Sequence, residues 1–150
     1  MVNEGHVPVV ATVAEDIDST TIAGQVSGAN GGEHLVSTDQ TIGLNVNADT
    51  AAGSIASAMN AEKLILMTDV PGIMRDSKDA DSLVRETTVV GANQLIKDKI
   101  VQGGMIPKVQ CCVSAIANGV KAAHIIDGRE PHSLLMEILT DIGCGTKIDS

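Results

Sequence analysis

The sequence of 150 residues contains no phenylalanine, tyrosine or tryptophan. A hydrophobic core must therefore be built from isoleucine, valine, leucine, methionine and alanine. A bound base or sugar ring has no aromatic side chain on which to stack, which excludes the usual platforms for single-stranded nucleic acids.

Basic residues are also scarce, because 10 Lys and Arg stand against 19 Asp and Glu, for a net charge of −9. Nucleic acids and anionic membrane surfaces are both bound through basic faces. The charge balance therefore argues against either partner. No apolar run reaches the roughly 20 residues of a spanning helix, and residues 1–6 lack a basic, apolar leader, which predicts no signal or transit peptide.

Three cysteines, Cys111, Cys112 and Cys144, make an odd count without a CxxC spacing. This pattern predicts neither a disulfide framework nor a zinc site, and it fits a reducing compartment. We expect buried, inert thiols rather than a redox role.

The length fits one domain, and 43% hydrophobic with 19% charged residues is typical of a globular protein. Apolar runs rich in β-branched residues predict strands, and apolar residues at helical spacing predict helices. The expected strands are residues 6–14, 63–67, 122–126 and 143–148, and the expected helices are 51–59, 87–99, 107–118 and 131–139. In the second helix we expect Val90, Leu95 and Ile96 to face inward. Small, polar residues 27–33 predict a hairpin tip or surface loop. A phosphate-binding glycine loop is the alternative, although no lysine follows and no apolar strand immediately precedes these residues.

Alternating strands and helices indicate an α/β fold with a mostly parallel sheet. Ligands of such sheets bind where the strands end and helices begin. This rule directs attention to residues 68–74, 103–108 and 127–129.

A phosphate site is indicated at residues 103–108, with sequence GGMIPK. The two glycines leave backbone N–H groups unobstructed at a helix start, where the helix dipole adds positive charge. Lys108 contributes a full charge in the first turn. The alternative interpretation is an ordinary helix start with a solvated lysine.

Asn45, Asn47 and Asp49 share one side of the chain if the segment is extended, because side chains alternate along a strand. Asp49 lies at a predicted helix start, where a carboxylate acts as a cap. It could instead orient a catalytic lysine or a metal ion. His124 lies in an apolar strand, which favours a satisfied core histidine.

Several segments together resemble the acetylglutamate kinases of the amino-acid kinase family. They are NVNADTAAG at 45–53, AEKLILMTDVPGI at 61–73, GGMIPKV at 103–109, HIIDGR at 124–129 and GCGT at 143–146. The TDVPG turn at 68–72 is also similar to carbamate, uridylate and aspartate kinases. The segments at 103–108 and 124–129 are much more specific.

The resemblance implies a three-layer α/β/α sandwich with a mainly parallel sheet. It also implies ATP-dependent phosphorylation of the side-chain carboxylate of N-acetyl-L-glutamate, a step in arginine biosynthesis. Mg²⁺ is expected with the nucleotide, and no dedicated metal site is expected in the protein.

Residue roles follow from the matching motifs. Lys108 would stabilise the transferring phosphoryl group, Asp49 would hold the active-site lysines, and Asn45 and Asn47 would bind acetylglutamate. The nucleotide would be held by Thr68, Asp69, Val70, Gly72, Ile73, Met74, Gln102, Gly104 and Met105. Arginine-inhibited members of the family have the residues found here as His124, Glu137 and Gly143, which makes arginine feedback a secondary hypothesis.

The family's first half, with its glycine-rich loop and substrate-binding arginine, has no counterpart in this sequence, so residues 1–150 are expected to form the nucleotide-binding domain. One alternative is a non-catalytic module that binds nucleotide or arginine. Another is a different member of the family, such as a carbamate kinase. The resemblance further implies a homo-oligomeric enzyme in the cytoplasm or the plastid stroma, and it leaves open a PII-type regulatory partner.

Overall fold

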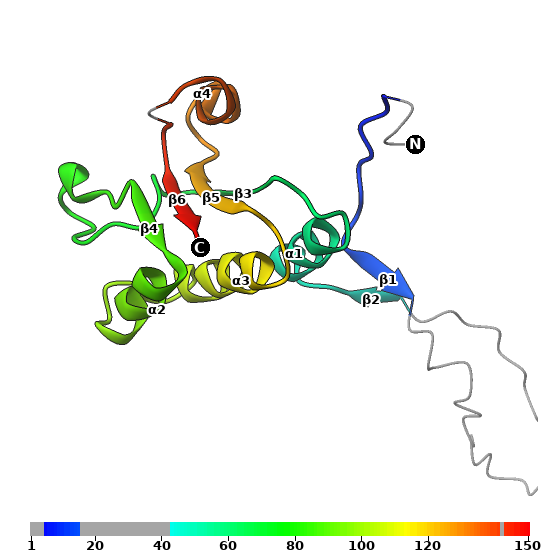
Figure 1. The fold of residues 1–150 in the computed structure, drawn as a ribbon, viewed down its shortest axis with the longest axis horizontal. Helices are drawn as coiled ribbons and strands as arrows, with labels where there is room; N and C mark the ends of the chain where they lie inside the picture. The colour runs from blue at the N-terminus through cyan, green and yellow to red at the C-terminus, as the bar shows by residue number, and fades with distance from the viewer. Residues whose placement is uncertain (1–4, 16–42, 142) are drawn as a thin grey trace, which may run out of the picture. The chain divides into compact units, whose positions relative to one another are not determined.

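The computed structural model describes residues 5–15, 43–141 and 143–150, and the chain divides into two units, Met1–Asn47 and Ala48–Ser150 (Figure 1). In the first unit, strand β1 (Val13–Glu15) pairs antiparallel with β2 (Gly43–Asn45), so that Val13 lies opposite Asn45. The predicted strand over residues 6–14 was therefore wrong except at its end. An apolar segment becomes a strand only where a neighbour pairs with it, and Val9 is 97% exposed. The predicted loop at 27–33 lies outside the described residues.

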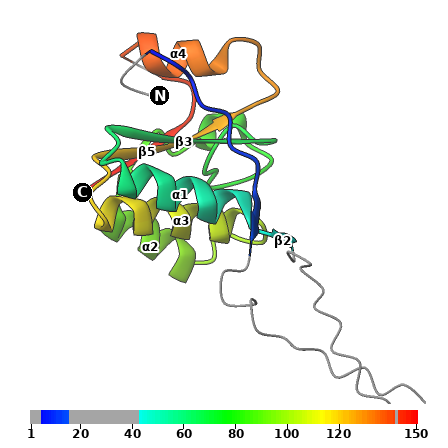
Figure 2. The same ribbon diagram turned by 90° about the vertical axis from the view of Figure 1, so that its right-hand side faces the viewer.

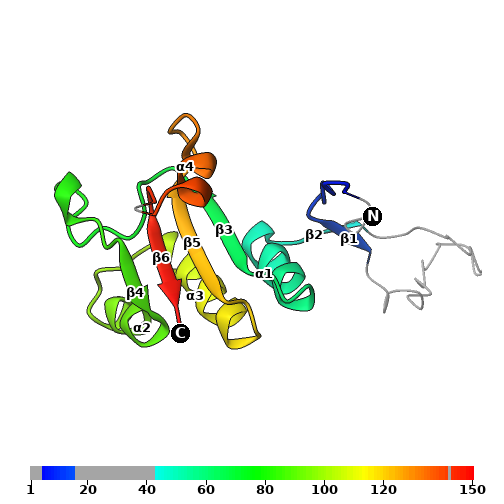
Figure 3. The ribbon, with the colours of Figure 1, turned by 45° about the horizontal axis from the view of Figure 1, so that its top comes forward.

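A four-stranded sheet forms the centre of the second unit, in the order β3, β5, β6, β4 (Figure 3). Its strands are β3 (Lys63–Thr68), β4 (Glu86–Thr88), β5 (Ala122–Asp127) and β6 (Thr146–Asp149). The pairs β3–β5 and β4–β6 are parallel, whereas β5 and β6 are antiparallel. This confirms the prediction of a mainly parallel sheet.

Helices cover both faces of this sheet (Figure 2). The helices α1 (Ala48–Ala58), α2 (Val89–Lys97) and α3 (Met105–Ala117) lie on one face, and α4 (Ser133–Leu139) lies on the other. The three-layer α/β/α sandwich is thereby confirmed. In the part of the chain that the structure describes, one outer layer is the single short helix α4.

The hydrophobic core lies between the sheet and the helices α1, α2 and α3, which pack on the same face of it. It is built without aromatic rings, from fully buried aliphatic and small side chains such as Val109, Cys112, Ile125 and Ile148. Burial raises the pKa of Cys112 to about 12, so its thiol stays protonated at neutral pH. All three cysteines are free.

The strand β4 is absent from the sequence prediction, which placed Thr87 at the start of a helix. The helix α2 begins instead at Val89, because the Thr88 hydroxyl caps it by accepting the Gly91 N–H at 3.2 Å. Residues 86–88, which include this cap, pair with β6, and their own sequence does not indicate so distant a partner. The prediction that Val90 faces inward was wrong: its side chain is 79% exposed, and Ala92 and Leu95 are the buried residues of α2.

One further helical element lies in the described chain. A short 3-10 helix, Ala80–Ser82, lies in the charged loop between β3 and β4. None of the helices in the described ranges is both long enough and apolar enough to cross a membrane.

Candidate functional site

A cavity of about 730 Å³ lies beside the end of β3 and the start of α3. Ligand pockets commonly measure about 300–1,000 Å³. Two segments distant in the sequence line this first cavity, one at residues 68–77 and the other at 99–108. Every residue predicted to hold the nucleotide lines it: Thr68, Asp69, Val70, Gly72, Ile73, Met74, Gln102, Gly104 and Met105. The structure thus brings the two predicted segments together around one space.

The loop that follows β3 is attached to two other parts of the fold. The Ile73 N–H donates to Thr146 Oγ1 at 2.9 Å, and the Ile73 carbonyl accepts the Val84 N–H at 2.8 Å. Gly72 has a φ of +149°, and a Cβ at this position would lie 2.6 Å from Thr146 Oγ1. A glycine is therefore required where the loop approaches β6.

The start of α3 forms another wall of the first cavity. Gly104 precedes the helix and provides no side-chain cap. The N–H groups of Met105 and Ile106 donate to the carbonyls of Gln102 and Gly103 at 3.2 Å each, so these two are not as unobstructed as the sequence suggested. The helix dipole still places partial positive charge at this end, which favours an anion.

Lys108 adds a full positive charge to the same wall and is held by Asp49 from α1. Its Nζ lies 3.1 Å from Oδ1 and 3.0 Å from Oδ2 of Asp49. The two side chains are 23% and 21% exposed, so the pair is mostly shielded from water. Asp49 is the second residue of α1 rather than its cap. The geometry matches a carboxylate that orients a lysine, the second of the two interpretations left open by the sequence.

Asn45 and Asn47 belong to the first unit of the chain. Asn45 is the last residue of β2, and Asn47 is the last residue of that unit. Their predicted role in binding the substrate remains a prediction.

The third predicted ligand position, at residues 127–129, adjoins the first cavity without lining it. The Arg129 guanidinium donates to both carboxylate oxygens of Asp127, at 3.0 and 2.7 Å, and these hydrogen bonds hold the pKa of Asp127 below its usual value. The Gly128 N–H donates to the Thr68 carbonyl at 2.7 Å. This turn therefore supports the end of β3.

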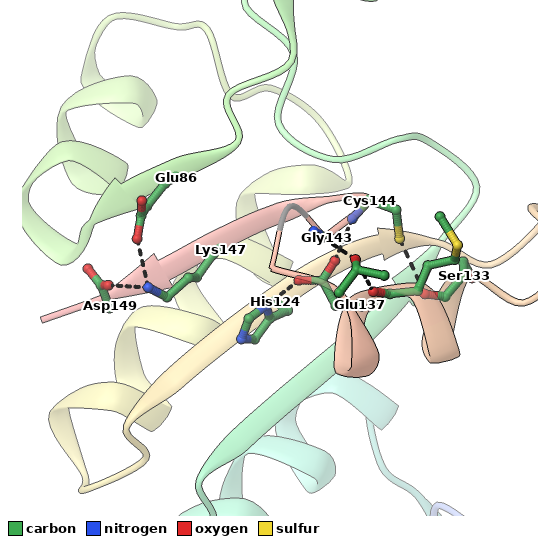
Figure 4. Close-up of polar contacts among 10 residues, drawn as sticks. Glu86, His124, Ser133, Glu137, Gly143, Cys144, Lys147 and Asp149 are labelled. Atoms are coloured by element: carbon green, nitrogen blue, oxygen red, sulfur yellow. Dashed lines mark hydrogen bonds and ion pairs between the residues drawn. The ribbon is translucent and has the colours of Figure 1, made fainter.

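A second cavity, of about 620 Å³, lies on the α4 side of the sheet. Its walls are the starts of β3 and β5, the end of α4 and part of residues 143–147. His124, Glu137 and Gly143, which the sequence groups as an arginine site, all line it. Charged side chains of both signs line its remaining wall, including Glu86 and Lys147, 2.7 Å apart (Figure 4).

His124 and Glu137 form a buried pair in the second cavity (Figure 4). His124 Nδ1 lies 2.5 Å from Glu137 Oε1, and Glu137 Oε2 accepts the Cys144 N–H at 2.7 Å. Burial by itself would raise the pKa of Glu137, but the Cys144 N–H and His124 outweigh it and lower the pKa below its usual value. The other ring nitrogen, His124 Nε2, is buried without a hydrogen-bond partner. The sequence prediction of a satisfied core histidine is therefore correct for one nitrogen only.

Gly143 is held close to this pair. It has a φ of +64°, and a Cβ at this position would lie 2.7 Å from Glu137 Oε2. Any larger residue would therefore disturb the carboxylate that His124 contacts.

Several residues of the first cavity were not predicted from the sequence. Lys99 and Val101 lie in the connection between α2 and α3, and Arg75 and Asp76 follow the predicted turn. Their positions next to the two predicted motifs could have indicated that they also line the cavity. Thr146, by contrast, contacts the site from 73 residues away along the chain, and its neighbours in sequence do not indicate this.

The model of the amino acid kinase family matches residues 1–127. The chain belongs to this family. Among curated amino acid kinases, it is 48% identical over 148 residues to the acetylglutamate kinase of Acaryochloris marina and 48% identical over 148 residues to that of Nostoc punctiforme. Each match covers 99% of this chain but only 44% and 42% of the respective relative. The chain therefore spans less than half the length of these enzymes.

Two solved structures have folds similar to that of this chain. N-acetylglutamate synthase from Neisseria gonorrhoeae, in complex with coenzyme A and L-arginine, gives a TM-score of 0.65 at 29% identity, covering 73% of this chain and 24% of that one. Carbamate kinase from Giardia lamblia bound to AMP-PNP gives 0.57 at 23% identity, covering 73% and 34%. At that identity, the second match supports the amino acid kinase fold only.

Proposed function

We propose that this chain is the nucleotide-binding part of an acetylglutamate kinase, which transfers the γ-phosphoryl group of ATP to the side-chain carboxylate of N-acetyl-L-glutamate in arginine biosynthesis. The observation that carries the proposal is the first cavity, where both motif segments meet beside a lysine held by a carboxylate. The 48% identity to an acetylglutamate kinase over nearly the whole chain supports this substrate over that of another family member.

In the proposed reaction, a carboxylate oxygen of the substrate attacks the γ-phosphorus. The bond from that phosphorus to the β–γ bridging oxygen breaks, ADP leaves, and an acyl phosphate forms. Charge spreads over the outer oxygens of the group in transfer, so a fixed cation beside them lowers the barrier. Lys108 supplies that cation, and Asp49 holds its Nζ in place. Asn45 and Asn47 are proposed to bind the acceptor.

The nucleotide is proposed to lie along residues 68–74 and 102–105, with its phosphates toward the start of α3. In the described ranges, no group of three or more His, Cys, Asp or Glu side chains is placed to hold a metal ion. Mg²⁺ is commonly bound by substrate phosphates with one or two carboxylates. Asp69 and Asp76 line the first cavity and fit that requirement.

The direct test is a calorimetric titration of MgADP into the folded chain. We expect saturable binding that Gly104→Leu weakens about tenfold or more, because the new side chain would enter the first cavity. A Cβ at Gly104 meets no protein atom within 4 Å, so the substitution should leave the fold intact.

Val90→Leu is the matched control, since it places a leucine near the start of another helix, at a position that is 79% exposed and outside the cavity. Its affinity for MgADP should equal that of the wild type. The nucleotide site would be wrong if the folded wild-type chain did not bind MgADP, or if both variants bound it equally well.

A non-catalytic binding module is the alternative from another class. Trapping of the acyl phosphate as a hydroxamate distinguishes the two, because only a kinase produces it. A carbamate kinase would be revealed by its acceptor profile in the same assay. Assembly of the intact enzyme into a homo-oligomer, a PII-type partner and a location in the cytoplasm or plastid stroma remain proposals that follow from the resemblance.

Arginine binding in the second cavity is a second candidate function, favoured by the buried pair of Glu137 and His124. The lowered pKa of Glu137 keeps its carboxylate charged at neutral pH, as binding of a guanidinium requires. His124 Nε2 is buried in the cavity wall and lacks a partner, so a ligand could satisfy it.

Glu137→Gln is expected to weaken arginine binding about tenfold, measured by calorimetry, because it removes the charge while keeping an oxygen that can accept the Cys144 N–H. His124→Asn should also weaken it. Glu130→Gln, an exposed change of the same kind outside the cavity, should have no effect. Arginine affinities equal to that of the wild type in Glu137→Gln and His124→Asn would rule out this site.

A further inference from the structure

Thr146 connects the sheet to the loop that lines the first cavity. It is the first residue of β6 and is fully buried. Its Oγ1 lies 2.9 Å from the Ile73 nitrogen, across 73 residues of sequence. Ile73 is only 1% exposed, so its N–H depends on this acceptor more than an exposed N–H would. The contact is thus a buried hydrogen bond between the last strand and the loop that follows β3.

This hydrogen bond acts on residues that line the first cavity. Gly72, Ile73 and Met74 form part of its wall. The Ile73 carbonyl is engaged separately by the Val84 N–H at 2.8 Å, so the peptide groups on both sides of Ile73 are fixed by different segments. A buried N–H that loses its partner is costly, and the backbone then moves to find another acceptor. Loss of the Thr146 hydroxyl would therefore displace the cavity wall.

The start of β6 is itself held rigidly. Thr146 lies opposite Ile125 in the antiparallel pair of β5 and β6. Gly145 lies against the Ile125 carbonyl so closely that no side chain fits there. The Thr146 hydroxyl is therefore attached to a backbone that is fixed within the sheet, and it cannot shift to accompany a movement of residue 73.

We propose that Thr146 is a positioning residue for the nucleotide, which acts by fixing the Ile73 N–H and with it the cavity wall at residues 72–74. The inference rests on the proposed function, because it assumes that the first cavity binds a nucleotide. Thr146 does not line the cavity, and its effect passes entirely through the loop.

The test compares Thr146→Val, which keeps the shape of the side chain but removes the acceptor, with Thr146→Ser, which keeps the hydroxyl. Calorimetric titration of MgADP should show affinity about tenfold weaker for Thr146→Val and within about threefold of the wild type for Thr146→Ser. Hydrogen exchange of the Ile73 amide should be slow in the wild type and in Thr146→Ser, and faster in Thr146→Val.

Two outcomes would overturn the proposal. One is wild-type MgADP affinity with a slowly exchanging Ile73 amide in Thr146→Val. The other is an equal loss of affinity in both variants, which would assign the effect to packing of the methyl group. If Thr146→Val does not fold, Thr146→Cys replaces it, since a thiol is a weak acceptor, and the same comparison applies. A wild-type chain that fails to bind MgADP would contradict the proposed function, while the exchange of Ile73 would still decide whether Thr146 holds the loop.

Discussion

Replacing Lys108 by alanine is expected to lower kcat for acetylglutamate phosphorylation on the order of 100-fold or more. The Nζ of Lys108 is fixed 3.0 Å from Asp49 Oδ2, with its charge at the wall of the first cavity. An ammonium held in place before the reaction stabilises the charge that develops on the phosphoryl group. Its removal should therefore affect turnover far more than the binding of MgADP.

Hydroxamate trapping measures this turnover. Since the chain spans 44% of the Acaryochloris marina enzyme, the assay uses the chain joined to the segment of that enzyme which it does not span. Lys97→Ala, an exposed lysine of α2 that lines neither cavity, is the control and should leave turnover unchanged. Turnover near that of the wild type in Lys108→Ala would refute the role proposed for this lysine.

Gly145→Ala is expected to destabilise the fold by about 3 kcal/mol or more, at the upper end of overpacking effects. A Cβ at residue 145 would collide with the Ile125 carbonyl oxygen and lie 2.8 Å from Ile126 Cγ2. Because Ile125 pairs with Thr146 in the central strands, the backbone can yield only if that pairing breaks. Thermal unfolding followed by circular dichroism should show a Tm lower by roughly 10 °C or more, or no folded protein at all.

Gly104→Ala provides the comparison, because a Cβ at that position meets open space. Its effect on unfolding should stay within about 1 kcal/mol, the range expected at a helix start. If Gly145→Ala unfolded at the wild-type temperature, the close approach of residue 145 to β5 would be contradicted.

Local patterns predicted the buried strands and most helices correctly. The runs over residues 63–67 and 122–126 are largely apolar, and they form β3 and β5. The strand β5 is central and is buried along most of its length, whereas β3 lies at the end of the sheet, with Lys63 and Met67 exposed. The helix α3 could be recognised from apolar residues at helical spacing, and Val109 and Cys112 are indeed fully buried. Such elements can be predicted because a regular helix or strand buries one face, and its buried positions therefore recur at a fixed spacing along the sequence.

The failures concern strands that depend on a distant partner. Residues 86–88 pair with β6, some 60 residues further along the chain, and the capping residue Thr88 marks the start of the helix without indicating that the residues before it form a strand. The segment at 6–12 is rich in valine, yet in the described residues it pairs with no strand. In both cases the partner, rather than propensity, decides whether a strand forms.

The amino-acid sequence was sufficient to predict the fold class, the acidic and aromatic-free character of the chain, and the separate motifs at 68–74 and 103–108. Each of these depends on composition or on residues that are close together in the sequence. The assembly of the two motifs into a single cavity, the pairing of Lys108 with Asp49, the buried contact of His124 with Glu137 and the support of Ile73 by Thr146 depended on the folded structure. Each joins residues far apart along the chain, or on different elements, and such distances are set by how helices and strands pack together rather than by any local pattern.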